Sequence, residues 1–327
     1  MRHSLILLTS FTIACFQYAS IANSQEGVGS YPSKPVLVIA PIASGGPIDT
    51  ETRLYSNRMA EILGQPFVVD NKPAAGGSIG GLFVAKAAPD GYTLLSLSTA
   101  FTIYPNFYDL PFDLLKDFVP ISQLSNRTTV FVVTPNSPIK SFTEYIAFAK
   151  ANPGKINFGT TGAGSGTHLA GAWMHSATGS TVNYIHYKGT GPLMPDLFAG
   201  RIDVTPVGLI VALSAIKAGK VRVLAILNDR RAKSLPGVPT VSEQGIPGYN
   251  YANWLGFVAP RATPIAIVNK LSDGFAKVAS SPDVVAALER GGGEMVGSTS
   301  NQFRQVLNDD LNRWRTLIQD AGIKIER

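Results

Sequence analysis

Cysteine and histidine are scarce in this chain, and both shortages narrow its chemistry. Among 327 residues there are one cysteine, Cys15, and four histidines. With no second cysteine to form an internal disulfide, stability must come from a hydrophobic core, which a chain of this length can build. We expect no metal site, because His168 and His175 have no carboxylate at ligand spacing and no H-E-x-x-H motif occurs.

Charged residues are also few, at 15% of the chain against 45% hydrophobic residues. This balance indicates a folded protein rather than a disordered one. The formal net charge is +6, but the basic residues are scattered, and the densest cluster, residues 229–233, includes an acid. Nucleic-acid binding favours a basic stripe with interleaved aromatic side chains, which the sequence lacks, so no nucleic-acid partner is expected.

Long apolar runs are missing after the N-terminus, so we expect a soluble mature chain. Residues 1–22 resemble a cleavable export signal: a basic start at Arg2, an apolar stretch over residues 5–14, and small residues at Ser20 and Ala22. Cleavage after Ala22 would remove the cysteine. The alternative is a lipid anchor at Cys15, because residues 12–15, Thr-Ile-Ala-Cys, faintly resemble a lipoprotein cleavage box.

Strand-like and helix-like segments alternate along the chain, which predicts an α/β fold with parallel sheets and right-handed crossovers. The pattern occurs in two blocks, separated by strand-like crossings near residues 129–134 and 254–259. We therefore expect two lobes, the first formed by residues 31–129 and 255–327 and the second by residues 130–254. An apolar stripe from Phe303 to Ile318 predicts a long C-terminal helix that returns to the first lobe. Strands are predicted at residues 36–40, 67–69, 92–96, 130–133, 156–159, 182–187, 202–206 and 221–226.

Two glycine-rich turns, each between a predicted strand and a predicted helix, are the clearest sign of a ligand. One is residues 162–168, Gly-Ala-Gly-Ser-Gly-Thr-His, and the other is residues 43–47, Ala-Ser-Gly-Gly-Pro. Such a turn leaves several backbone N–H groups free at the positive end of a helix dipole, which favours an anion. If the two turns face each other, they can hold a small anion between them. The alternative for the upstream turn is an ordinary connection in which Asp49 caps the helix.

Four further residues are weaker candidates. Lys188, in the third strand-to-helix turn at residues 187–192, can pair with a carboxylate or lie solvated at a rim. Ser98 and Thr99 follow the third predicted strand. Asp203 lies in a strand-like segment, where an acid needs a partner, and it either faces the ligand or caps the start of the strand.

Catalysis and cofactor binding are disfavoured by the same residues. Ser165 and His168 can be imagined as a hydrolase pair, but the G-x-S-x-G pattern fails because Ala163 and Thr167 occupy the glycine positions. A dinucleotide fingerprint fails for the same reason at Thr167, and no P-loop Gly-Lys-Ser/Thr occurs. We therefore expect no cofactor, and a secreted serine hydrolase remains the rival hypothesis.

A series of ordered motifs resembles the Bug family, the periplasmic solute-binding proteins of tripartite tricarboxylate transporters. The resemblance covers residues 31–325. Its motifs are residues 31–35 Tyr-Pro-Ser-Lys-Pro, Gly45-Gly46 with Asp49 and Arg53, residues 63–66 Leu-Gly-Gln-Pro, residues 71–73 Asn-Lys-Pro with Gly76-Gly77, residues 89–95 Pro-Asp-Gly-Tyr-Thr-Leu-Leu, residues 149–155 Ala-Lys-Ala-Asn-Pro-Gly-Lys, residues 187–189 Tyr-Lys-Gly, Asp196-Leu197, Gly219-Lys220 and residues 235–240 Leu-Pro-Gly-Val-Pro-Thr.

The resemblance implies a two-lobed, flytrap-like periplasmic binding fold of type II, with a mostly parallel sheet flanked by helices in each lobe and no catalysis. It implies a monomer that captures a small organic carboxylate between the lobes and presents it to integral-membrane transporter subunits or, alternatively, to a sensor receptor. The ligand would be held by backbone amides and hydroxyls of the loops. The implied ligand-binding residues are Ile42, Ala43, Ser44, Gly45, Gly46, Asp49, Ser98, Thr99, Thr161, Gly162, Gly164, Ser165, His168, Lys188, Gly189, Thr190 and Asp203.

The sequence departs from the family pattern at a few positions. Ser44 stands where a proline usually precedes the glycine pair, and this change falls in the implied pocket. His186 replaces a common proline before the Tyr-Lys-Gly motif. Other departures are Lys72, Ala74, Thr205 and Pro206.

Overall fold

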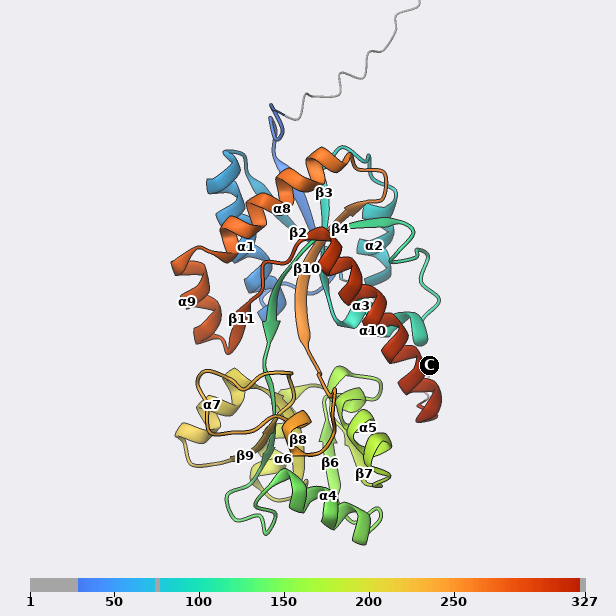
Figure 1. Ribbon diagram of the computed structural model, residues 1–327, viewed down its shortest axis with the longest axis vertical. Helices are drawn as coiled ribbons and strands as arrows, with labels where there is room; N and C mark the ends of the chain where they lie inside the picture. The colour runs from blue at the N-terminus through green and yellow to red at the C-terminus, as the bar shows by residue number, and fades with distance from the viewer. Residues whose placement is uncertain (1–28, 74–76, 324–327) are drawn as a thin grey trace, which may run out of the picture.

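The protein is built from two α/β lobes stacked along its long axis (Figure 1). The computed structural model describes residues 29–73 and 77–323, so the predicted export signal and Cys15 lie outside the described residues. Each lobe has one sheet flanked by helices, which confirms the predicted two-lobed α/β fold. Within the described residues, no helix combines the length and the apolar character that a membrane crossing requires.

The first lobe contains a six-stranded sheet with the strand order β11-β4-β10-β3-β1-β2. Strand β1 pairs in parallel with β2 and β3, whereas β10 runs antiparallel to both β3 and β4, and β11 antiparallel to β4. Helices α1, α2, α3, α8 and α9, together with the start of α10, belong to this lobe. The bounds are β1 Val36–Ala40, α1 Pro47–Leu63, β2 Phe67–Asn71, α2 Ser78–Ala85, β3 Thr93–Ser98, α3 Ala100–Ile103, the 3-10 turn η2 Tyr104–Asn106, β4 Phe118–Arg127, β10 Asn253–Pro260, α8 Ile265–Ala279, α9 Pro282–Arg290, β11 Gly293–Met295 and α10 Ser300–Asp320.

The second lobe contains a five-stranded sheet with the order β7-β6-β8-β5-β9. Strand β6 pairs in parallel with β7 and β8, and β5 runs antiparallel to β8 and β9. Both sheets are therefore mixed, with most strands in one direction. The bounds are β5 Thr129–Val133, α4 Phe142–Ala151, β6 Asn157–Thr160, α5 Gly166–Thr178, β7 Asn183–His186, α6 Thr190–Phe198, β8 Val204–Gly208, α7 Leu209–Lys217, β9 Arg222–Ile226 and the 3-10 turn η3 Ser242–Gln244.

Apolar periodicity explains the elements that the sequence predicts well. In α1, Tyr55 and Met59 are fully buried in the first-lobe core, and the helix ends at Gly64, which adopts the left-handed conformation expected of a terminating glycine. Strand β4 has no such signal, because polar residues interrupt it. Ser122 and Ser125 are buried there with their hydroxyls donating to the Ser298 carbonyl oxygen at 2.7 Å and to Glu51 at 3.1 Å.

The chain crosses between the lobes at two places. Strand β4 ends at Arg127 and β5 begins at Thr129, and the return crossing enters β10 at Asn253. Asn228 joins the first crossing, since its side-chain oxygen accepts from the Thr129 amide at 3.0 Å and its side-chain nitrogen donates to the Arg127 carbonyl at 3.2 Å. Thr129 thus pairs in the sheet of the second lobe and Trp254 in the sheet of the first lobe, the reverse of what the predicted boundaries imply. The exact lobe boundaries stay a prediction.

Helix α10 belongs to both lobes: it returns to the first lobe, as predicted, and also packs against the second. Phe303 and Leu307, near its start, are buried in a first-lobe cluster with Trp254. Trp314, near its end, is fully buried in the second-lobe core, with its ring 6.2 Å from that of Trp173 in α5. A helix of 21 residues is about 30 Å long, enough to reach along the side of both lobes (Figure 1).

We predict that Trp314→Ala destabilises the protein by about 3–5 kcal/mol, because it opens a large cavity in the second-lobe core. Urea unfolding measures the effect. The control is Arg315→Ala, an exposed position on the same helix, which should change the free energy of unfolding by less than about 0.5 kcal/mol. A loss at Trp314 as small as that of the control would show that α10 does not stabilise the second lobe.

Candidate functional site

The loops that follow the parallel strands lie between the lobes. In the first lobe, the end of β3 adjoins the start of β10 at the crossing, where the Thr99 amide donates to the Trp254 carbonyl. In the second lobe, the end of β8 pairs with the start of β5, so Gly208 faces Thr129. Strands β1 and β6 run parallel to these neighbours. The carboxyl ends of both sheets therefore face the junction, the usual place for a ligand in open α/β sheets.

The first-lobe loop, residues 41–46, connects β1 to α1. Gly45 is exposed, with φ of 84°, and its N–H donates to Oδ2 of Asp49 at 2.9 Å. Asp49 is only 3% exposed and also accepts from Arg53 Nε at 3.0 Å and from Asn71 Nδ2 at 2.8 Å. Burial acts to raise the pKa of Asp49, but these hydrogen bonds outweigh it and hold the pKa below its ordinary value.

Other amides of this loop remain available. Among the described residues, the N–H groups of Ala43, Ser44 and Gly46 have no hydrogen-bond acceptor in the protein. Ala43 and Ser44 are exposed. Because α1 begins at Pro47, these donors lie at the positive end of its dipole, where an anion is favoured.

The second-lobe loop, residues 161–165, connects β6 to α5 and has the same design. The N–H of Gly164, whose φ is 68°, donates to Nδ1 of His168 at 3.0 Å. Ser165 caps α5, because its hydroxyl accepts from the His168 amide at 3.3 Å. The Thr161 amide donates to the Thr167 hydroxyl at 2.9 Å, so Thr161 contributes to the shape of the loop.

This loop also leaves donors without partners. Within the described part of the chain, the N–H groups of Ala163, Gly166 and Thr167 find no acceptor in the protein. Ala163 is exposed, and Gly166 and Thr167 form the first turn of α5. The second lobe therefore also offers a set of unpaired amides at a helix N-terminus.

The geometry does not support the hydrolase hypothesis for Ser165 and His168. Nδ1 of His168 accepts an N–H, so it carries no proton and is already occupied. The Ser165 hydroxyl contacts the His168 backbone and, at 3.0 Å, the hydroxyl of Thr167. No hydrogen bond joins the His168 ring to Ser165 in the described structure, so the serine lacks the base that would activate it.

Histidines 168, 175 and 186 gather behind the second-lobe loop. The His168 ring lies 4.7 Å from that of His186, whose Nδ1 is 2.6 Å from the Thr160 hydroxyl. His175 is bonded at both nitrogens, to Tyr145 at 2.6 Å and to Tyr184 at 2.5 Å. Burial, together with the neighbouring histidine, lowers the pKa of His168 to about 4 and that of His175 to about 3. With acids and cysteines included, no described group of these residue types could hold a metal ion.

The third turn adds a cation to the same edge of the sheet. Lys188 follows β7, is exposed, and forms no ion pair with any described residue. Gly189, with φ of 101°, is the N-cap of α6, and Thr190 is its first residue. The backbone oxygen of Tyr187 lies 3.6 Å from where a Cβ on Gly162 would be, so this turn adjoins the second-lobe loop.

Ser98 and Thr99 differ in their roles. The Thr99 hydroxyl donates to the Ala252 carbonyl at 3.0 Å and accepts from the Trp254 amide at 2.8 Å. Both of its hydrogen-bonding capacities are thus used to join the end of β3 to the return crossing. Ser98, at the end of β3, forms no side-chain hydrogen bond with any described residue and is the better candidate for a ligand contact.

Asp203 lies at the wrong end of the second sheet. It precedes β8, and its Oδ2 accepts from the amide of Asn157, the first residue of β6, at 2.7 Å. The two strands run from that edge toward the junction, so Asp203 is a full strand length away from the loops. Asp203 therefore does not lie with the glycine loops, as the prediction required, and it caps the start of a strand instead.

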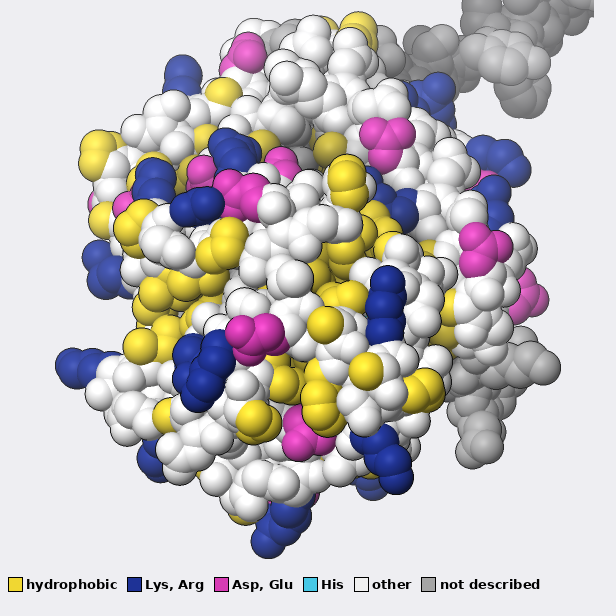
Figure 2. Space-filling view, turned by 60° about the horizontal axis from the view of Figure 1, so that its bottom comes forward, with side chains coloured by type: hydrophobic (Ala, Val, Ile, Leu, Met, Phe, Trp, Pro, Cys, Tyr) yellow, Lys and Arg dark blue, Asp and Glu magenta, His cyan; other side chains and the backbone are white. Residues whose placement is uncertain are grey.

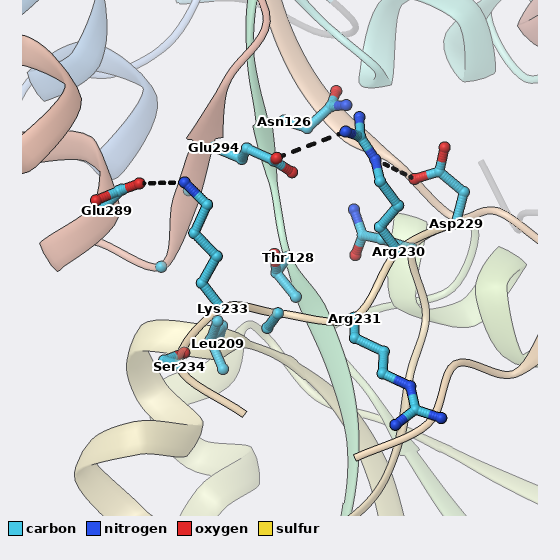
Figure 3. A pocket seen from close by; sticks show the side chains of 14 residues that line it. Asn126, Thr128, Leu209, Asp229, Arg230, Arg231, Lys233, Ser234, Glu289 and Glu294 are labelled. Atoms are coloured by element: carbon cyan, nitrogen blue, oxygen red, sulfur yellow. Dashed lines mark hydrogen bonds and ion pairs between the residues drawn. The ribbon is translucent and has the colours of Figure 1, made fainter. Parts of the chain in front are cut away.

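A separate cavity of about 280 Å³ lies at another part of the junction, between α9–β11 of the first lobe and residues 228–234 of the second (Figure 3). Its charged groups are paired across the lobes: Lys233 with Glu289 at 2.8 Å and Arg230 with Glu294 at 3.7 Å. Figure 2 shows apolar side chains gathered along the band where the lobes meet, with acidic and basic side chains beside them.

Comparisons with known proteins agree with this architecture. The family model described as "Tripartite tricarboxylate transporter family receptor" matches residues 52–323. The chain belongs to this family. BugT of Bordetella pertussis is 33% identical over 303 residues, which cover 91% of this chain and 92% of BugT, and the resemblance to the Bug family is thereby confirmed. Members of the family are periplasmic solute-binding proteins.

Three solved structures are similar over most of the chain. The periplasmic binding protein BugD has a TM-score of 0.72 at 30% identity, covering 90% of this chain and 100% of BugD. Rpa4515 of R. palustris, solved with adipate, has a TM-score of 0.75 at 30% identity, covering 90% and 99%. MatC of Rhodopseudomonas palustris, solved with bound malate, has a TM-score of 0.71 at 29% identity, covering 88% and 100%.

We predict that the free energy of unfolding of this protein falls in mild acid, because its buried histidines are neutral in the folded state. His175 stays neutral in the folded protein, whereas in the unfolded chain it takes up a proton near its ordinary pKa of about 6.5. The unfolded state therefore binds more protons below about pH 6.5, and stability falls as the pH is lowered from there. By pH 5 this amounts to roughly 2 kcal/mol for one such histidine.

Urea unfolding at pH 7.5 and pH 5 measures this dependence, in a window above the ordinary pKa values of the carboxyl groups. His175→Gln should have a shallower dependence on pH than the wild-type protein. An equal dependence in both proteins would show that His175 titrates normally in the fold.

Proposed function

We propose that this protein captures a small organic carboxylate between its two lobes and presents it to a membrane transporter of the tripartite tricarboxylate type. The proposal is supported above all by the two glycine loops, which offer unpaired amides at the facing edges of both sheets. A carboxylate can accept several of these N–H groups at once, and each charge-assisted hydrogen bond is stronger than a neutral one.

The chemistry of the loops favours an acid over a neutral solute. The donors lie at the N-termini of α1 and α5, and Lys188, which pairs with no acid among the described residues, lies in the turn that adjoins the second-lobe loop. Hydrogen bonds to a charged group contribute roughly 1.5–3 kcal/mol each. Three or four of them support micromolar affinity, near −8 kcal/mol, after the costs of association.

The size of the acid is inferred from the relatives. Adipate and malate, which the two solved relatives hold, are small dicarboxylates. A second carboxylate has a plausible partner here in Lys188 and the amides of Gly189 and Thr190. The proposed site comprises the loops at residues 42–46 and 161–168 with Ser98 and residues 188–190, and it leaves out Asp203.

Closure of the lobes around the ligand completes the mechanism. The ligand contacts both loops only when the lobes come together, so binding shifts the population toward a closed form. The transporter would then recognise the closed form. Residues 1–22 would direct export to the periplasm and then be removed, and no catalytic step is needed.

We predict that a thermal-shift screen of mono-, di- and tricarboxylates and amino acids identifies a stabilising acid. At 100 times its dissociation constant, a ligand adds roughly 2.7 kcal/mol of stability. Gly164→Val should abolish the shift, because a β-branched residue cannot readily adopt φ of 68° and the loop must change shape.

The matched control is Gly154→Val. Gly154 has φ of 71° and open space around its Cβ position. It precedes the start of β6, at the edge of the sheet remote from the junction. This variant should suffer the same backbone strain and keep the ligand response. An equal response from both variants would place the binding site elsewhere.

We also predict that neither the wild-type protein nor Ser165→Ala hydrolyses esters. Ser165→Ala removes the N-cap of α5 and should cost about 1 kcal/mol of stability. Turnover of a chromogenic ester by the wild type that is lost in the variant would support the hydrolase instead.

A further inference from the structure

Each of the two ligand loops contains the same kind of internal hydrogen bond, to which the comparisons assign no role. In each loop, a glycine in the left-handed region donates its N–H to a side chain four residues later, in the first turn of the following helix. The first pair is Gly45 and Asp49, at 2.9 Å, and the second is Gly164 and His168, at 3.0 Å. The two acceptors are 3% and 7% exposed, respectively.

The acceptors differ in chemistry but not in geometry. Asp49 is an ionised carboxylate that Arg53 and Asn71 hold in place. His168 is a neutral imidazole whose ring packs against those of Tyr184 and His186, each at 4.7 Å between centroids. Both side chains are therefore fixed from behind and present a single acceptor atom to the loop. Two unrelated residue types with the same position and partner indicate that the acceptor itself matters.

The bond occupies one N–H group of each loop, which is then not free for a ligand, and it fixes the direction of the other N–H groups. With its N–H held by the helix, the glycine can no longer rotate freely about its own backbone bonds. The neighbouring donors, Ser44 and Gly46 in one loop and Ala163 and Gly166 in the other, are then left unpaired in a fixed arrangement. A pre-arranged set of donors loses less entropy when it binds a ligand than a flexible one does.

We propose that Asp49 and His168 are equivalent positioning residues, which shape the two carboxylate-binding loops without contacting the ligand. This inference rests on the proposed carboxylate-binding function. It revises the expectation that both side chains touch the ligand. It also assigns the ligand contacts to the unpaired amides rather than to those of Gly45 and Gly164.

The test compares two substitutions at each position. His168→Asn and Asp49→Asn keep an acceptor oxygen near the loop, whereas His168→Leu and Asp49→Leu remove it. Malate and adipate are the probes, titrated separately by calorimetry. The leucine variants should bind at least about tenfold more weakly, as expected for the loss of one hydrogen bond to a buried acceptor. The asparagine variants should stay within about threefold of the wild type.

Asp203→Leu is the matched control, because Asp203 also accepts a backbone amide but lies at the far edge of the second sheet. It should lower stability in urea and leave the affinity unchanged. Wild-type affinity in the leucine variants, or asparagine variants as weak as the leucine ones, would overturn the proposal.

Amide hydrogen exchange gives a readout that needs no ligand. In the wild-type protein, the Gly45 and Gly164 amides should exchange more slowly than those of Ser44 and Ala163, and His168→Leu should remove the protection at Gly164. Equal exchange of Gly164 and Ala163 in the wild type would refute the positioning role. If neither acid binds the wild type while the protection pattern holds, the failure lies in the proposed ligand and not in the positioning.

Discussion

Backbone N–H groups at the start of a helix have no partner within that helix, and this protein places two such helix starts at the edges of its two sheets that face the junction. Each sheet brings the end of a parallel strand to the junction, and each strand passes through a glycine loop into a helix. In the proposed mechanism, water satisfies these donors while the lobes are apart. A carboxylate can replace that water with stronger hydrogen bonds, and it can do so for both lobes at once only when they close.

The proposed closure would take place around a helix that both lobes share. The start of α10 is buried in the first lobe with Trp254, and its end is buried in the second lobe against Trp173 of α5. Helix α5 also carries the second-lobe loop at its N-terminus. The second-lobe loop and the contact with α10 therefore lie on the same helix.

Much of this architecture could be predicted from the sequence, because its signals are local. Apolar alternation and helix-ending glycines locate most strands and helices, and the density of glycine identifies the two loops. Strand β4 escaped prediction because Ser122 and Ser125 are buried polar residues whose partners, Ser298 and Glu51, are remote in sequence. The dual membership of α10 also depends on contacts that no local pattern encodes.

The roles of individual site residues were harder to predict for the same reason. Asp203 has the residue type of a ligand contact, but the direction of β8 carries it to the far edge of the sheet. Thr99 and His168 lie close to the proposed site, yet the Thr99 hydroxyl and Nδ1 of His168 already form hydrogen bonds within the protein. Residue type indicates which side chains could bind a ligand, whereas the hydrogen bonds formed within the whole fold determine which donors remain free to do so.

The most direct test of this account is the chemical shift of individual backbone amides during a titration with malate and with adipate. The account predicts large, saturable shifts at Ser44 and Gly46 in the first lobe and at Ala163, Gly166 and Thr167 in the second, with one dissociation constant for all of them. Saturable binding that leaves the amides of either loop unchanged would contradict it.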